Sequence, residues 1–159
     1  MLIIVESESP LLAMRFMYQT SVQTRIPSYI DFARHAYFDK NEERLARIGY
    51  LEAAIKLLPV FQNHDVILSG FHLTEICYGI HVRFYNVDHV WEYDRVLAAS
   101  PNVRLVYIPS TMSFESPIED DIEVPPEAME YAYNKSMMKK TRVDLSKDNV
   151  EAVIKWVYA

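Results

Sequence analysis

The feature that most constrains this chain is an apolar strand followed by a turn without glycine. Leu2–Val5 is a run of four apolar residues, and Glu6-Ser7-Glu8-Ser9-Pro10 separates it from a helix-like stretch. Many nucleotide-binding domains begin with such a strand, turn and helix. The chain holds only three glycines, Gly49, Gly70 and Gly79. Because a loop that cradles phosphate needs glycine to bring its backbone close to the anion, the first turn is not a standard phosphate loop.

Apolar strands and amphipathic segments alternate along the rest of the chain. The sequence predicts strong strands at 66–68 and 103–108 and weaker ones at 29–33 and 142–145. It predicts helices over 41–62, 86–99 and 126–140, and a last helix opened by Ser146. Continuous apolar strands that alternate with helices are typical of a sheet covered on both faces. We therefore expect a three-layer α/β fold with a mostly parallel five-stranded sheet and helices on both faces.

Length and charge narrow the class of protein further. The 159 residues suit one domain, 1–159, in which the acidic, proline-containing segment 113–127 is expected to be an exposed loop. The net charge of −6 argues against direct nucleic-acid binding. No segment has the roughly 20 apolar residues of a membrane span, and no signal-peptide pattern is visible. With Cys77 as the single cysteine, we expect a cytoplasmic protein without disulfides or membrane attachment.

The segment VILSGFHLTEICYGIHVRFY, residues 66–85, carries most of the candidate site residues. A strand ends at Leu68, the turn Ser69–His72 follows, and a helix is expected to start at Thr74-Glu75. Ligands of open α/β sheets bind beyond the carboxyl ends of the strands, where this turn and the first turn should meet. The candidates for a substrate pocket are Arg34, His35, His72, Thr74, Glu75, Tyr78 and Arg83. Each has a structural alternative: Thr74 as a helix cap, Tyr78 as core, and Arg34 and His35 as solvated or hydrogen-bonded side chains.

On these residues the chain resembles the thymidylate-kinase-like deoxynucleoside monophosphate kinases, especially the small versions carried by bacteriophages. Ile3-Ile4-Val5-Glu6 matches the first strand of that family, and Thr74-Glu75-Ile76-Cys77-Tyr78-Gly79 matches its S-E-x-x-Y-G motif. Segments 90–110 and 141–157 resemble the family's later helices and strands. The resemblance implies a P-loop nucleoside monophosphate kinase fold over most of the chain, and it implies dimers.

The phosphate loop of that family is degenerate here. Alignment puts Ser7 where the first glycine belongs and Leu12, Ala13 and Met14 where Gly-Lys-Ser/Thr belongs; Glu8, Ser9 and Pro10 lie between. Ser69-Gly70 replaces the family's Asp-Arg, and segment 113–127 is acidic where the family's lid usually carries arginines. The departures predict that ATP–Mg²⁺ binding is lost, so that we expect no cofactor, no metal and no catalytic residue.

Three functions remain open from the sequence. The first is a phage-type pseudokinase that binds a deoxynucleotide or regulates a partner, as a homodimer or as a heterodimer with an active kinase or another nucleotide-metabolism enzyme. The second is an active deoxynucleotide kinase with a non-standard phosphate site, helped by Arg15 in the first helix. The third is an unrelated phosphoesterase or hydrolase, for which the five histidines show no metal-ligand spacing and the chain has no G-x-S-x-G elbow.

Two further expectations concern single residue types. Cys77 lies mid-helix among apolar residues and is expected in the core rather than as a nucleophile. The helical aromatics Tyr131, Tyr133, Trp156 and Tyr158 cannot all point inward, which favours an interaction surface at the C-terminal helices.

Overall fold

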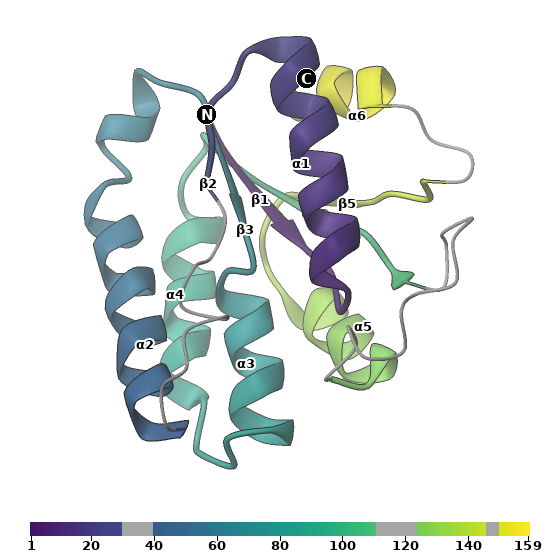
Figure 1. Ribbon diagram of the computed structural model, residues 1–159. Coiled ribbons are helices and arrows are strands. Elements are labelled where there is room, and N and C mark those ends of the chain that lie inside the picture. The colour runs from purple at the N-terminus through teal and green to yellow at the C-terminus, as the bar shows by residue number, and fades with distance from the viewer. Residues whose placement is uncertain (30–39, 111–123, 146–149) are drawn as a thin grey trace.

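The computed structural model describes residues 1–29, 40–110, 124–145 and 150–159 (Figure 1). In chain order the elements are β1 (Leu2–Glu6), α1 (Pro10–Thr24), β2 (Ser28–Tyr29), α2 (Lys40–Lys56), the 3-10 helix η2 (Val60–Gln62), β3 (Val66–Ser69), α3 (His72–His81), α4 (Asp88–Ala98), β4 (Val103–Tyr107), α5 (Pro126–Lys135), β5 (Lys140–Arg142) and α6 (Val150–Tyr158). None of the helices in these ranges combines the length and apolar character that a bilayer span requires.

The sheet has the strand order β2-β3-β1-β4-β5, and every pairing is parallel. β1 lies at its centre and pairs with β3 through Leu2–Val66 and with β4 through Leu2–Val103. Four of the strands have three to five residues, whereas β2 is only a two-residue pairing at the edge. The expected α/β class with a mostly parallel sheet is confirmed. Where five strands are expected, the sheet has four strands of three to five residues and, at its edge, the two-residue pairing β2.

Alternate residues of β1 pack into two separate cores. Leu2 and Ile4 face one side, where α2, α3, α4 and α5 cover the sheet, and Ile3 and Val5 face the other, where α1 and α6 cover it (Figure 1). Strands buried on both faces are predominantly apolar, which is why Leu2–Val5 of β1 and residues 66–68 of β3 are continuous apolar runs; the polar Glu6 and Ser69 stand at the ends of these strands.

Several predicted boundaries are wrong for identifiable reasons. The strand expected at 142–145 lies two residues earlier, at Lys140–Arg142, although Val143 is buried beside it. The helix expected to reach 140 ends at Lys135, because Ser136 is extended, with ψ at 137°. The helix expected over 41–62 ends at Lys56. Pro59 follows closely, and it disfavours helical backbone at the residue before it.

The third helix starts two residues before its expected start. Gly70 takes a positive φ of 62°, which only glycine adopts freely, and α3 begins at His72 directly after this turn. Of the strand expected at 29–33, Tyr29 is part of β2, and the remaining residues lie outside the described ones together with Arg34 and His35.

Candidate functional site

The β1–α1 turn is shorter than a phosphate loop. Only Ser7, Glu8 and Ser9 separate the end of β1 at Glu6 from the start of α1 at Pro10. A standard G-x-x-x-x-G-K-[ST] loop places about five residues between the strand and its Gly-Lys pair. All three turn residues are buried, with no more than 3% of each exposed. The turn therefore lies packed inside the protein rather than open around an anion.

The start of α1 uses the turn's own side chains. The Ser9 hydroxyl accepts a hydrogen bond from the Leu12 backbone N–H at 3.4 Å, and the Ser9 N–H donates to the Ser7 hydroxyl at 3.1 Å. Pro10 occupies the first helical position, where its missing N–H costs nothing. Leu12 and Ala13 are buried in the core beneath α1. The positions aligned with Gly-Lys thus serve core packing.

Glu8 ties the turn to the segment after β4. Its carboxylate accepts hydrogen bonds from the Ser110 N–H and the Ser110 hydroxyl, both at 2.7 Å, and from the Tyr107 hydroxyl at 3.2 Å. Burial, and then the nearby Glu8 charge, raises the pKa of Tyr107 well above its usual value. Glu8 is fully buried, so its carboxyl group and the three hydrogen bonds that it accepts fill the inside of the β1–α1 turn.

The carboxylate of Glu6, at the end of β1, lies at the N-terminus of α3. One of its carboxylate oxygens accepts from the backbone N–H groups of Phe71, at 3.1 Å, and Leu73, at 2.9 Å. The other accepts from the Thr74 hydroxyl at 2.5 Å. A carboxylate satisfies the free N–H groups of a helix start and interacts favourably with the helix dipole. An anion-binding position at this edge of the sheet is therefore filled by a residue of the chain itself.

Asp94 and His72 extend this network toward α5. The His72 Nε2 and the Asp94 Oδ1 are 2.9 Å apart, and Asp94 also accepts from the Ser136 hydroxyl at 2.6 Å and the Met137 N–H at 2.9 Å. Burial by itself would raise the pKa of Asp94, but the hydrogen bonds from these three residues outweigh it and hold the pKa below its usual value. On its other side, His72 Nδ1 lies 4.0 Å from the Glu6 carboxylate.

A second group gathers around Glu75, one turn further along α3. Its buried carboxylate forms an ion pair with Arg83 at 2.7 Å and accepts from the Tyr85 hydroxyl. The Arg83 guanidinium carbon lies 5.2 Å from the centre of the Tyr78 ring. Three of the predicted pocket residues, Glu75, Tyr78 and Arg83, are thus in one cluster.

The structure distributes the predicted residues over these two groups. His72 and Thr74 belong to the Glu6 network and lie inside the protein, whereas Arg34 and His35, and the segment 113–123 of the expected acidic loop, lie outside the described residues. Sequence reasoning missed the parts played by Asp94 and Ser110. Asp94 interrupts the apolar face of the helix predicted over 86–99, and this position could have indicated a buried, hydrogen-bonded carboxylate.

Two further expectations from the sequence are that the chain holds no metal and that Cys77 lies in the core. No cluster of three or more metal-ligating side chains occurs among the residues that the structure describes. Cys77 is buried in the core, as expected, and burial together with the charges of Glu6 and Glu8 raises the pKa of its thiol to about 12. A thiol with such a pKa is not a nucleophile at neutral pH.

Comparison with known proteins finds similar structures but no similar sequences. No protein-family profile matches the sequence, and no curated protein matches it significantly. The YorR protein of Bacillus subtilis, solved in complex with phosphorylated GDP, superimposes with a TM-score of 0.62 over 99% of this chain and 94% of its own, at 13% identity.

Two other solved structures match less well. An uncharacterized protein from Eubacterium ventriosum has a TM-score of 0.49 at 10% identity, covering 100% of this chain and 99% of its own. A deoxyadenosine kinase from M. mycoides, solved with dCMP and dCDP, has a TM-score of 0.44 at 13% identity, covering 99% and 97%. The likeness to YorR shows that the two chains share a fold.

Proposed function

We propose that this chain is a non-catalytic member of the nucleotide-kinase-like proteins, which keeps the fold and a nucleotide-binding edge but has lost phosphoryl transfer. It would act as a nucleotide sensor or as the regulatory subunit of a nucleotide-metabolism enzyme. The shared fold with YorR, whose structure contains phosphorylated GDP, supports the nucleotide class. The resemblance of Thr74–Gly79 to the S-E-x-x-Y-G motif supports the same class.

The main support for the proposed loss of catalysis is the pair of hydrogen bonds that the Glu8 carboxylate accepts from Ser110. Phosphoryl transfer asks the protein mainly for positive charge and close backbone around the phosphates. Here the turn offers a buried carboxylate whose hydrogen bonds are already used within the protein. One unit charge at about 4 Å from another is worth roughly 4 kcal/mol at an effective dielectric near 20. Replacing the usual lysine by such a repulsive term would slow the reaction by several powers of ten.

The Glu75, Tyr78 and Arg83 cluster supports a retained monophosphate site. Arg83 is held in place by Glu75 and lies over the Tyr78 ring, so its guanidinium is preorganised. Arginine binds a phosphate through two parallel hydrogen bonds. Tyr78 is a buried core residue, so its ring orients Arg83 and is not itself a surface for a base. We propose that a deoxynucleoside monophosphate, rather than ATP, binds beside this cluster.

The exposed aromatics support a protein partner. Tyr131 and Tyr158 are 64% and 48% exposed, which confirms that the aromatics of the C-terminal helices do not all point inward. Tyrosine is enriched in protein interfaces. A homodimer or a heterodimer with an active kinase is therefore part of the proposal.

Calorimetric titration tests the proposal directly. The protein is titrated with ATP–Mg²⁺ and separately with each of the four deoxynucleoside monophosphates. We expect saturable binding of at least one monophosphate and none of ATP–Mg²⁺. Arg83→Gln should weaken the monophosphate at least tenfold, while the control Arg95→Gln, on the exposed face of α4, should not. Failure of all four monophosphates to bind would refute the proposed nucleotide site.

A coupled ADP-release assay separates this proposal from an active kinase. We expect no turnover of any deoxynucleoside monophosphate by ATP–Mg²⁺. Turnover that Arg15→Ala abolishes would show instead that a non-standard phosphate site is active. Tight binding of ATP–Mg²⁺ would contradict the loss of the phosphate site.

A further inference from the structure

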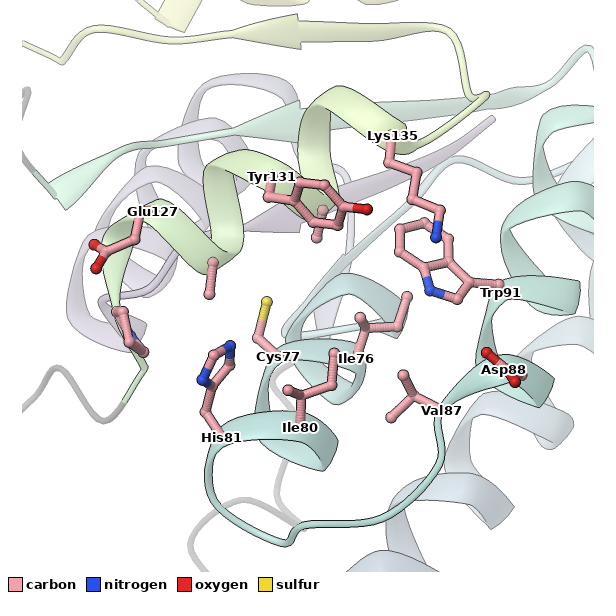
Figure 2. A pocket seen from close by; sticks show the side chains of 13 residues that line it. Ile76, Cys77, Ile80, His81, Val87, Asp88, Trp91, Glu127, Tyr131 and Lys135 are labelled. Carbon is pink, nitrogen blue, oxygen red and sulfur yellow. The ribbon is translucent and has the colours of Figure 1, made fainter.

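A cleft of about 470 Å³ lies between α3, α4 and α5 (Figure 2). Its floor is aliphatic and comes from Ile76 and Ile80 of α3, Val87 before α4, and Ala128 and Ala132 of α5. None of the residues that line it belongs to the β1–α1 turn, and none is Glu75, Tyr78 or Arg83. Pockets of roughly 300–1,000 Å³ with apolar walls are the size that small-molecule ligands occupy.

The mouth of the cleft carries two aromatic rings and a cation. Figure 2 shows Tyr131 and Lys135 extending from α5 and Trp91 from α4, with the Lys135 side chain reaching over the indole. The Lys135 Nζ lies 4.3 Å from the centre of the Trp91 ring and 5.9 Å from that of Tyr131. Among the ion pairs that the described residues form, none includes Lys135. Among the described residues, the Lys135 ammonium thus lies over aromatic faces without an ion pair, although Asp88, Glu92 and Asp94 line a neighbouring hollow with it.

We propose that this cleft binds a small molecule with an apolar, planar body and one anionic group, either a carboxylate or a phosphate. The planar body would lie against Trp91 and Tyr131 over the aliphatic floor, and the anionic group would pair with Lys135. An ammonium already placed on an aromatic ring loses little further freedom when it pairs with a ligand. This cleft is separate from the proposed nucleotide site, so an experiment can refute binding at one of them without refuting binding at the other.

The other charged groups at the rim favour a ligand with a single anionic group. Asp88 and Glu127 are exposed and lie in the first turns of α4 and α5, where the helix dipoles stabilise them. Two carboxylates and one ammonium at the same rim disfavour a ligand with several anionic groups. Covalent capture is not part of the proposal, because Cys77, which also lines the cleft, has a pKa raised to about 12 by burial and by the charges of Glu6 and Glu8.

Binding can be followed at Trp91 itself. The protein is labelled with 5-fluorotryptophan, and its two tryptophan ¹⁹F resonances are assigned with Trp156→Phe. The probes are 2-naphthoate, its neutral amide, and the cationic 2-naphthylmethylammonium. We expect the carboxylate to shift the Trp91 resonance saturably, the amide to bind about tenfold more weakly, and the cation to bind most weakly.

Three variants test the parts of the site. Lys135→Gln should remove the preference for the carboxylate over the amide, whereas the matched control Lys155→Gln, in an exposed ion pair on α6, should keep it. Ala128→Phe should fill the cleft and weaken all three probes, with folding checked by circular dichroism. Absence of saturable binding, equal binding of anion and cation, or an unchanged preference in Lys135→Gln would each overturn the proposal.

Discussion

The carboxylate of Glu6 at the end of β1 accepts a hydrogen bond from the backbone N–H of Leu73 at 2.9 Å and thereby joins the central strand to the start of α3. The same oxygen accepts from Phe71, and the neighbouring oxygen accepts from Thr74. A single buried side chain thus binds two backbone N–H groups and one hydroxyl at one helix start. The link is structural, and it occupies a position where a ligand's anion could otherwise bind.

Removing this link should destabilise the fold strongly. Glu6→Ala leaves the N–H groups of Phe71 and Leu73 buried without an acceptor, and we expect the free energy of unfolding to fall by about 3 kcal/mol. Urea denaturation followed by circular dichroism measures the change. The control Glu92→Ala, in an exposed pair with Arg95, should change it by less than about 0.5 kcal/mol. Equal effects of the two substitutions would show that the buried contacts contribute nothing.

Much of the fold could be predicted from the sequence, because its signals are local. The apolar run Leu2–Val5 and the mostly apolar segment 103–108, interrupted only by Arg104, form β1 and β4, since strands covered on both faces are predominantly apolar. The short strand β5 was misplaced for the opposite reason. Its residues Lys140–Arg142 are polar, and their pairing with β4 is fixed by the tertiary structure rather than by an apolar pattern.

The site was harder to predict, because its contacts join residues far apart in the chain. The missing glycines and lysine predict a degenerate phosphate loop, which stays a prediction; what the structure shows at these residues is a short, buried β1–α1 turn. That Glu8 would bind Ser110, or that Asp94 would bind His72, depends on which strands and helices are neighbours. Sequence spacing contains no signal for such pairs, so only the buried charge on the apolar face of α4 could have drawn attention to Asp94.

The Asp94–His72 pair should make stability depend on acid pH. The pKa of Asp94 is lowered in the folded protein, so Asp94 contributes stability that is present above the usual aspartate pKa of about 3.9 and is lost as pH falls through the lower folded value. Asp94→Asn should cost about 3 kcal/mol at pH 7 and flatten the fall in unfolding free energy below about pH 4.

Denaturant titrations from pH 7 down to pH 3 measure that dependence. Asp88→Asn is the matched control, because Asp88 is exposed at the start of the same helix. The control removes only an exposed charge at the helix start, so it should stay within about 1 kcal/mol of the wild type at every pH. A constant difference between Asp94→Asn and the wild type across this range would contradict the assigned role of Asp94.

The two helical glycines should respond oppositely to alanine. A Cβ at Gly79 would clash with the Val87 side chain and come within 3.0 Å of the Tyr85 ring, whereas a Cβ at Gly49 meets no atom of the described residues within 4 Å. Gly79→Ala should lower the free energy of unfolding by about 2 kcal/mol, because overpacking outweighs the better helix propensity. Gly49→Ala should raise it by about 0.5–1 kcal/mol. Thermal unfolding of both variants tests this, and a gain from Gly79→Ala would contradict the close packing of α3.

Lys140 closes the C-terminal end of α5. Its ammonium donates to the backbone carbonyls of Tyr133, at 2.6 Å, Asn134, at 3.0 Å, and Ser136, at 2.6 Å. These carbonyls have no partner within the helix, and a cation at this end also interacts favourably with the helix dipole. Lys140→Met keeps the length of the side chain but removes the three hydrogen bonds, and we expect a loss of about 2 kcal/mol.

Lys139→Met is the matched control for this substitution, since Lys139 is the preceding residue and is exposed. Denaturant unfolding should separate the two variants by most of the predicted loss. Hydrogen exchange locates the effect: in Lys140→Met the amides of the last turn of α5 should exchange faster, while those of α2 should not change relative to the global stability. If both lysine variants unfold alike, the ammonium contributes no more than a solvated surface charge, and the end of α5 must be fixed instead by the hydrogen bond between the Ser136 hydroxyl and Asp94.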